Sequence, residues 1–327
     1  MSILSDSDLL VKDEEGTNPN YGYEPYKRPI SLYIEFGVIN LDKPRGPTSH
    51  VVTSWVKRIT GATKAGHAGT LDPQVSGVLP VGINKSTPAL RYALHSPKEY
   101  VGVMRLHGEV SIESLEKVFS IFKGRIYQRP PKKSAVRRKL RTREIYDLKL
   151  LEVSGRDVLF KLKCESGFYV RKLVHDMGLI LGVEAHLAEL RRTATGPFKE
   201  DESLVTLHDV DLAFTLWRKK NDDSLIRRVV LPFETIFLEF PKVVIRDSAV
   251  SAITHGAQLA VPGILKLTKD VEKGKKVAIF TQKGEIVAVG TANMSKEEIL
   301  SSEKGIAVTL ERVFMPRDLY PRMWRKK

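Results

Sequence analysis

One aspartate, Asp72, stands in the most unusual segment of the sequence, residues 66–81, and is the only carboxylate there. The segment is dense in glycine, proline, serine and threonine. Pro73 pushes Asp72 towards an extended backbone, and the glycines let another segment approach closely. A lone aspartate in a loop is usually a turn former or a helix cap. The residue types alone therefore allow two roles for Asp72. A structural role in a turn or cap is the more common, and a catalytic role is the less common.

A second segment, residues 165–173, is predicted as a strand end that runs into a helix. Arg171 lies there among apolar and aromatic neighbours, so a buried guanidinium at this position needs an acidic partner. An exposed arginine at a helix start is the more common alternative. The sequence thus offers one candidate carboxylate and one candidate cation, far apart in the chain.

Composition narrows the class of protein that carries these residues. The chain has 327 residues, with 53 Lys plus Arg against 39 Asp plus Glu, a formal net charge of +14. A hydrophobic content of 42% excludes a wholly disordered chain. The charge favours a polyanionic partner, most often nucleic acid, although a solvated basic surface has the same composition. The single cysteine, Cys164, excludes an intramolecular disulfide and a thiolate metal cluster, and fits a reducing intracellular compartment.

Membrane attachment and a resident cofactor are not expected. The first 20 residues carry five acids against one lysine, the wrong sign for a signal or transit segment. The uncharged stretch at residues 249–265 contains proline, glycine and polar residues, so it does not suit a spanning helix. No set of His, Asp and Glu has metal-ligand spacing, and no Walker-type phosphate loop occurs.

The pattern along the chain predicts four parts. Residues 1–33 lack an apolar period and are predicted as an arm packing on another domain. In residues 34–239 strands and helices alternate irregularly, which predicts an α+β domain with a mixed, largely antiparallel sheet. Short strands separated by Lys-Gly turns predict a small β-barrel-like domain at residues 240–320. Residues 321–327 form a basic C-terminal end.

Local signals predict the elements that must position the candidate residues. A Pro-Thr-Ser cap at residues 47–49 begins a helix that stops at Gly61, and Ser111 begins another. A third helix is predicted over residues 169–181. Residues 66–82 are predicted to be irregular. The predicted strands are residues 100–106, 145–153, 157–163, 243–245, 276–280, 285–290 and 306–310.

Residues 66–81 resemble the catalytic loop of the TruB-type pseudouridine synthases. Four further segments resemble motifs of that family and occur in the family's order. They are Leu-Asp-Lys-Pro-Arg-Gly-Pro-Thr-Ser at 41–49, Lys-Glu-Tyr at 98–100, Gly-Phe-Tyr-Val-Arg-Lys-Leu at 167–173 and Leu-Arg-Arg-Thr at 190–193.

The resemblance is greater to the archaeal and eukaryotic branch called dyskerin, the catalytic subunit of H/ACA ribonucleoproteins. Residues 129–138 are similar to that branch. So are residues 254–257 and 261–263, in a C-terminal part that resembles an RNA-binding PUA domain. Eukaryotic members carry a lysine-rich tail, which is not seen after Lys327, so an archaeal source is expected.

The resemblance implies an isomerase that converts uridine in RNA to pseudouridine without a cofactor. Asp72 is then the nucleophile or base, and Arg171 is its ion-pair partner. We expect Asp72 in a dry pocket, where Arg171 opposes the rise in carboxyl pKa that burial causes. Tyr100 would stack on the flipped uracil and help to remove the C5 proton late in the reaction. In a half-buried strand, however, most tyrosines are only structural.

The same resemblance assigns supporting roles around the base pocket. Leu190 would form its apolar wall, although by itself the residue would be taken as core. Lys43 and Tyr169 would buttress the site, and His67 would contact the RNA.

A basic run at residues 129–143 holds eight basic residues and no acid. A solvated charged loop is the default interpretation of such a run. The resemblance implies instead a loop that grips RNA over the site. The predicted RNA contacts are Arg129, Lys132, Lys133, Arg137, Arg138, Lys139, Arg141 and Arg143 in this run, and His255 and Gly256 in the PUA-like part.

The resemblance also implies partners: an H/ACA guide RNA, substrate ribosomal RNA and also tRNA, a small rod-like accessory protein, a β-barrel accessory protein and a kink-turn-binding protein. The expected location is the cytoplasm for an archaeal source and the nucleolus for a eukaryotic one. Two alternatives stay open, a stand-alone enzyme for the T-loop uridine of tRNA and a non-catalytic RNA scaffold. The PUA-like part argues against the first, and the set of Asp72, Tyr100 and Arg171 argues against the second.

Overall fold

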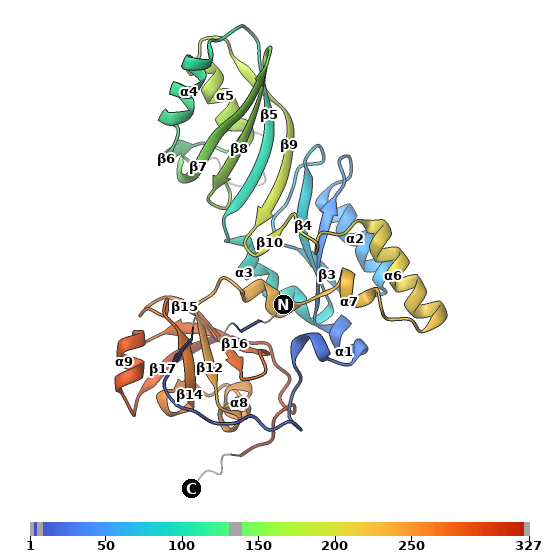
Figure 1. The fold of residues 1–327 in the computed structure, drawn as a ribbon, viewed down its shortest axis with the longest axis vertical. Helices are drawn as coiled ribbons and strands as arrows, with labels where there is room; N and C mark the ends of the chain where they lie inside the picture. Colours follow the sequence, from blue (N-terminus) through green and yellow to red (C-terminus); the bar gives the residue numbers. More distant parts are fainter. Residues whose placement is uncertain (1–2, 5–8, 131–138, 324–327) are drawn as a thin grey trace. The chain divides into compact units, whose positions relative to one another are not determined.

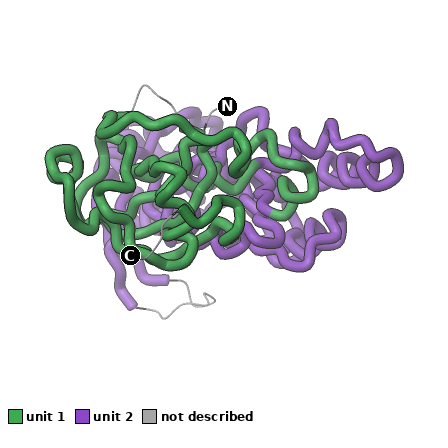
Figure 2. Tube along the Cα trace, turned by 90° about the horizontal axis from the view of Figure 1, so that it is seen from below, with its two compact units in different colours: residues 1–35, 232–327 green, residues 36–231 purple. Residues whose placement is uncertain are grey.

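The computed structural model describes residues 3–4, 9–130 and 139–323. The chain forms two compact units, which Figure 2 shows in different colours. One unit is the continuous stretch 36–231. The other combines the two ends of the chain, residues 1–35 and 232–327.

A curved sheet forms the body of the 36–231 unit (Figure 1). Its neighbouring strands are antiparallel, except that β4 and β9 run parallel. This architecture confirms the predicted α+β class with a mixed, largely antiparallel sheet. The strand order is β2 (Gly37–Lys43), β4 (Ser76–Ile83), β9 (Ala185–Thr195), β5 (Lys98–Leu106), β8 (Asp157–Cys164), β7 (Arg141–Ser154) and β6 (Gly124–Gln128), with β3 (Ala65–His67) on β4 and β10 (Phe198–Lys199) on β9.

Capping residues begin the helices of this unit where the sequence predicted. The Thr48 hydroxyl accepts a hydrogen bond from the Val51 N–H at 3.2 Å, and Gly61 ends α2 in the left-handed conformation. Ser111 caps α4 in the same way. None of the helices in the described part of the chain is long and apolar enough to cross a membrane. The helices are α2 (Ser49–Thr60), α3 (Leu90–Leu94), α4 (Ile112–Ile121), α5 (Val170–Ile180), α6 (Leu207–Lys220) and α7 (Ile226–Val229), after which the chain leaves the unit through β11 (Leu231–Pro232).

The prediction that residues 66–82 are irregular is wrong for most of their second half, because residues 76–83 form the buried strand β4. Its glycines serve close packing instead of turns. A Cβ on Gly77 would lie 2.2 Å from the carbonyl oxygen of Arg192, and one on Gly82 would lie 2.7 Å from the Ser86 hydroxyl. The irregular part is thus the loop between β3 and β4, residues 68–75, which carries Asp72.

The C-terminal residues form a second, smaller sheet that curls around its own apolar core (Figure 1). Its strands pair antiparallel apart from β12 and β15, which are parallel. This confirms the predicted small β-barrel-like domain. Its elements are β12 (Lys242–Ile245), α8 (Asp247–Thr254), β13 (Leu259–Ala260), β14 (Ile264–Thr268), β15 (Lys276–Thr281), β16 (Ile286–Ala292), α9 (Lys296–Ser301) and β17 (Ile306–Val313).

The N-terminal segment belongs to the same unit as this second sheet. Its strand β1 (Leu9–Val11) pairs with β14, and its helix α1 (Ile30–Glu35) follows further along. Between them, Arg28 makes a buried two-pronged ion pair with Glu234, and the Tyr23 N–H donates to the Glu285 carboxylate at 3.0 Å. Backbone pairing and buried charge therefore both fasten this segment to the C-terminal part of the chain.

Replacing Gly77 by alanine tests the close approach of β4 to β9. We expect Gly77→Ala to lower the free energy of unfolding by at least about 2 kcal/mol, because the added Cβ meets backbone and φ is +103°. Gly61→Ala is the matched control, since φ is +70° there but nothing lies within 4 Å of an added Cβ. It should cost about 1 kcal/mol. Urea denaturation measures both, and equal losses would contradict the close-packing explanation.

Candidate active site

Asp72 and Arg171 form an ion pair, although 99 residues separate them in the sequence. The Arg171 Nη2 atom lies 2.9 Å from the Asp72 Oδ2 atom. Asp72 stands in the loop between β3 and β4, and Arg171 stands in the first turn of α5. The two side chains are 60% and 64% exposed. The expected dry pocket is therefore wrong for the chain by itself, because loop and helix meet at the surface.

The buried side chain of Lys43 holds the backbone of the Asp72 loop. Its side chain is fully buried, and its ammonium donates to the carbonyl oxygens of Pro44 at 2.9 Å, Val75 at 2.8 Å and Pro73 at 3.3 Å. Burial lowers the pKa of Lys43, and the nearby Asp72 charge opposes this. Lys43 thus satisfies the backbone carbonyl oxygens of Pro73 and Val75, which follow Asp72 in the loop.

Ser49, the first residue of α2, holds the preceding residue of the loop. Its hydroxyl donates to the Leu71 carbonyl at 3.0 Å and accepts from the Leu71 N–H at 2.9 Å. The Ser49 side chain therefore joins the start of α2 to both backbone groups of Leu71, the residue before Asp72.

Arg192 joins the start of the same loop to strand β4, which follows it, and sequence reasoning missed this residue. The side chain is fully buried, with its Nε atom donating to the Val78 carbonyl at 2.8 Å and its Nη2 atom to the Gly69 carbonyl at 3.0 Å. The Leu-Arg-Arg-Thr motif contained the signal, since neighbouring residues of a strand point to opposite faces. Of two consecutive arginines in a strand between other strands, one must therefore point into the protein.

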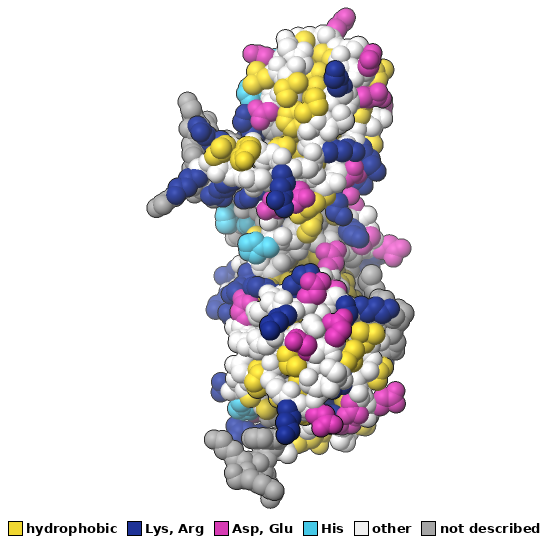
Figure 3. Space-filling view, turned by 90° about the vertical axis from the view of Figure 1, so that its left-hand side faces the viewer, with side chains coloured by type: hydrophobic (Ala, Val, Ile, Leu, Met, Phe, Trp, Pro, Cys, Tyr) yellow, Lys and Arg dark blue, Asp and Glu magenta, His cyan; other side chains and the backbone are white. Residues whose placement is uncertain are grey.

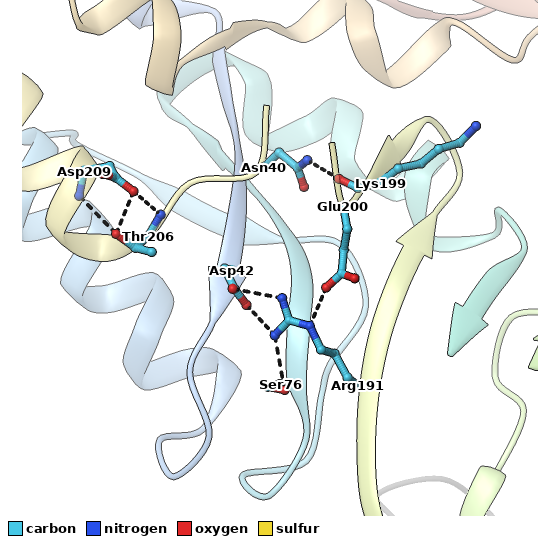
Figure 4. Close-up of polar contacts among 8 residues, drawn as sticks. All are labelled: Asn40, Asp42, Ser76, Arg191, Lys199, Glu200, Thr206 and Asp209. Atoms are coloured by element: carbon cyan, nitrogen blue, oxygen red, sulfur yellow. Dashed lines mark hydrogen bonds and ion pairs between the residues drawn. The ribbon is translucent and has the colours of Figure 1, made fainter. Parts of the chain in front are cut away.

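Arg191, the preceding residue of β9, makes a separate set of polar contacts (Figure 4). Its two terminal nitrogens donate to the Asp42 carboxylate at 3.0 and 2.9 Å, and its Nε atom pairs with Glu200. The Ser76 hydroxyl accepts a further, longer hydrogen bond of 3.4 Å. This network joins β2, the start of β4, β9 and the residue after β10.

Two further polar contacts stand beside this network in Figure 4. Asn40 donates from its side-chain nitrogen to the Lys199 carbonyl at 2.8 Å, which joins β2 to β10. Thr206 and Asp209 form a capping box that begins α6. The first contact holds β10 against β2, and the second fixes the start of α6.

Tyr100 and Leu190 lie on adjacent strands next to Arg192. Tyr100 pairs directly with Arg192, and Gly102 pairs with Leu190. The Tyr100 side chain is buried, which raises its pKa, while the positive charge of Arg192 opposes the rise. An added Cβ on Gly102 would lie 3.0 Å from the Leu190 Cδ1 atom, so Leu190 covers that glycine.

Tyr169 precedes α5 and helps to place Arg171. Its N–H donates to the buried Gln128 side-chain oxygen at 3.0 Å, and its carbonyl accepts from the Gln128 nitrogen at 3.1 Å. Arg143, predicted to contact RNA, donates to the Gly167 carbonyl at 3.4 Å in the turn before α5. The start of α5 is therefore fixed by backbone contacts, two of them through Gln128, which the sequence did not single out.

Lys98 is a second buried cation beside the loop that sequence reasoning left unassigned. Its ammonium donates to the carbonyl oxygens of Ala93, Leu94 and Ser96, where α3 ends. Burial, with the nearby charge of Arg192, lowers its pKa to about 7.

The remaining predicted RNA contacts lie apart from this cluster or outside the described residues. Arg129 and Lys139 are exposed and Arg141 is half-buried. Figure 3 shows lysine and arginine side chains spread over one face of the molecule. In the C-terminal unit, Gly256 is exposed and the exposed His255 ring contacts the Ser251 carbonyl at 2.7 Å and Arg322 at 2.9 Å. The predicted contacts outside the described residues are Lys132, Lys133, Arg137 and Arg138.

His67 is half-buried on β3, with its ring centroid 5.0 Å from that of His50. Burial is the main reason that its pKa falls to about 4, and the charges of His50 and Arg192 add to this. His67 is therefore neutral at physiological pH. Within the described part of the chain, no group of three His, Cys, Asp or Glu side chains is placed to hold a metal ion.

Four family models match consecutive parts of the chain. A TruB family pseudouridylate synthase N-terminal domain matches residues 57–170, and a tRNA pseudouridylate synthase B C-terminal domain matches residues 171–238. A PUA domain matches residues 241–314, and a DKCLD (NUC011) domain matches residues 2–53.

Curated archaeal proteins are similar to the chain over nearly its whole length. A probable tRNA pseudouridine synthase B of Thermococcus kodakarensis is 54% identical over 321 residues, 98% of this chain and 95% of the relative. The protein of the same description from Methanocaldococcus jannaschii is 51% identical and covers 99% of this chain and 96% of its own.

Solved structures agree in fold. The chain is similar to one in the crystal structure of an archaeal box H/ACA sRNP Nop10-Cbf5 complex, with a TM-score of 0.90, 51% identity and coverage of 97% and 98% of the two chains. A second match is a Cbf5-Nop10-Gar1 complex, with a TM-score of 0.91, 53% identity and 96% coverage of both chains. A third is an H/ACA RNP bound to a substrate RNA containing 2'-deoxyuridine, with a TM-score of 0.92, 51% identity and 97% coverage of both.

The low pKa of His67 predicts a pH-dependent stability. Between about pH 6.5 and 4 the unfolded chain binds a proton at this residue that the folded chain does not. The free energy of unfolding should therefore fall as the pH is lowered through that window, by up to about 3 kcal/mol. Urea denaturation of the wild type and of His67→Gln at several pH values measures it. The difference between their free energies of unfolding, followed against pH, is the contribution of His67. An imidazole NMR signal of His67 that titrates near 6.5 would refute it.

Proposed function

The chain belongs to the TruB family of pseudouridylate synthases, and from this we propose that it isomerises uridine to pseudouridine in RNA as the catalytic subunit of an H/ACA ribonucleoprotein. The observation that carries the proposal is the Asp72–Arg171 ion pair. Asp72 stands on a loop whose backbone is held by buried side chains. The DKCLD and PUA matches and the similarity to Cbf5 chains in H/ACA complexes support the particle-bound form.

In the proposed reaction the N1–C1′ bond of uridine breaks, the base rotates, and C5 bonds to C1′. The proton on C5 is lost and N1 gains one, so the reaction is a redox-neutral isomerisation. The Asp72 carboxylate acts at C6, at C1′ or as the base that removes a sugar proton, and then leaves again. Arg171 keeps it paired with a positive charge, while RNA laid over the exposed pair supplies the water exclusion that the chain lacks by itself.

The target uracil cannot react inside a stacked helix, so it must be flipped out. We propose that it stacks on Tyr100 and rests against Leu190. Because burial raises the pKa of Tyr100, its hydroxyl is neutral at physiological pH. Tyr100 therefore assists the loss of the C5 proton as a relay and not as a phenolate base. His67, which is also neutral, contacts RNA by stacking or hydrogen bonding and not by charge.

Sequence selection is delegated to the guide RNA, so the protein recognises RNA by backbone and shape. The net charge of +14 and the basic residues 129–143 suit phosphate contacts. We propose that the PUA-like residues 240–320, including His255 and Gly256, hold the guide RNA. Accessory proteins of the rod-like, β-barrel and kink-turn-binding kinds would complete the particle. Because the curated relatives are archaeal, we place this activity in the cytoplasm.

A stand-alone tRNA activity is the second candidate, because the curated relatives are described as probable tRNA pseudouridine synthases. It needs the same Asp72 chemistry and differs only in how the substrate is chosen.

Replacing Asp72 by asparagine tests the chemistry. We expect Asp72→Asn to lower the single-turnover rate of pseudouridine formation by at least about 10³-fold, because the amide is no nucleophile or base. RNA affinity should stay within about twofold. Asp176→Asn is the matched control, since this carboxylate also pairs with a cation of α5, Lys172, and should keep the activity. Turnover retained in Asp72→Asn would eliminate the catalytic assignment.

Guide dependence separates the two candidate functions. Pseudouridine is mapped in a ribosomal RNA fragment and in a tRNA transcript, with and without guide RNA and accessory proteins. We expect modification of the ribosomal target only when guide and accessory proteins are present. Modification of the tRNA T-loop at the full rate by the protein alone, with no guided activity, would favour the stand-alone enzyme.

A further inference from the structure

Arg192 is a buried cation for which no carboxylate partner is found among the described residues. Burying a guanidinium in this way is costly, and an apolar side chain of similar size would often be at least as stable. The charge is instead satisfied by backbone oxygens. Packing alone therefore does not require a charged side chain at this position.

The contacts of Arg192 converge on the groups that the proposed reaction uses. Its guanidinium reaches Gly69, three residues before Asp72, and Val78, six residues after it. Its backbone pairs with Gly77 on one side and with Tyr100 on the other. One residue therefore contacts the start of the Asp72 loop, the strand β4 that follows the loop, and the strand of Tyr100.

An irregularity in the sheet puts Tyr100 in this position. The pairing of β5 with β9 shifts between Glu99 and Tyr100, so that Glu99 faces Ala194 while Tyr100 faces Arg192. Thr193 is the extra residue of this bulge. A β-bulge re-aims the side chains beside it, and here it leaves the Tyr100 side chain in the field of the Arg192 guanidinium.

We infer that Arg192 is the positioning residue that fixes Asp72 and Tyr100 relative to each other, an inference that rests on the proposed function. Two nitrogens of its guanidinium, Nε and Nη2, each donate to a different carbonyl oxygen. A lysine at this position keeps the charge but has no planar fork with which to hold Gly69 and Val78 together. The geometry of the fork, and not its charge alone, sets the distance between carboxylate and aromatic ring.

Single-turnover kinetics of Arg192→Met and Arg192→Lys test this inference in the assembled particle with guide and substrate RNA. Misplacement of reacting groups by about 1 Å costs about 100-fold in rate, so we expect a loss of that order in Arg192→Met. Arg192→Lys should stay at least about 10-fold slow. RNA affinity should remain within about twofold in both. A wild-type rate in Arg192→Met, or full rescue by Arg192→Lys, would overturn the inference.

Met104→Ala is the matched control for simple loss of stability. Met104 is fully buried on β5, the strand of Tyr100, and takes no part in holding the loop. The control should unfold more easily yet keep a rate close to that of the wild type at temperatures where it is folded. An equal loss of rate in Met104→Ala would show that destabilisation of the sheet is sufficient, and would overturn the positioning role.

Hydrogen exchange of the free protein gives a readout that does not depend on activity. Peptides that cover residues 68–78 should exchange faster in Arg192→Met than in the wild type or in Met104→Ala. Unchanged exchange would overturn the inference, even if the wild type forms pseudouridine. If the wild type forms none, the proposed function fails, while faster exchange still shows that Arg192 holds the loop. Should Arg192→Met not fold, Arg192→Lys decides by the same two measurements.

Discussion

The backbone carbonyl oxygens of the Asp72 loop are the groups on which the rest of the site depends. A loop between two strands has no ladder partner for them, and buried carbonyls must be satisfied. Here Lys43, Ser49 and Arg192, from β2, α2 and β9, hold the loop at Gly69, Leu71, Pro73 and Val75, and Arg192 also binds Val78 in the strand that follows. The loop is thus shaped by its surroundings, and Asp72 is presented from a fixed frame.

The Asp72–Arg171 ion pair, in contrast to these buried contacts, lies at the surface. Asp72 and Arg171 are both largely exposed, and an exposed pair contributes little to stability. Its value lies in where it holds the carboxylate. The rigid and buried part of the site is therefore the support, while the reactive part is open to the macromolecule that must cover it.

Sequence reasoning succeeded where a local signal exists and failed where a distant partner decides. The capped start of α2 at Thr48 was predictable from neighbouring residues, and so was the fold class. Strand β4 was not, because its glycines and proline suggest turns until the backbone of Arg192 is known to lie against Gly77. The pairing of Asp72 with Arg171 came from the family resemblance, since spacing alone could not bring the two together. Arg192 itself was missed because the two consecutive arginines of β9 indicate that one of them points inwards, but only the pairing of β9 with its neighbours decides which one.

The arrangement of the two ends of the chain bears on how the protein is made. β1 leaves the ribosome early, whereas its partner strand β14 begins only at Ile264. Likewise, Glu234 is synthesised 206 residues after its partner Arg28. At roughly 5–20 residues per second this delay is about 10–40 s. During translation the continuous 36–231 unit can fold first, with an unpaired leading strand beside it. Until β14 has been synthesised, the backbone groups of β1 lack their partner strand, so the sheet that joins the two ends of the chain can form only late in translation.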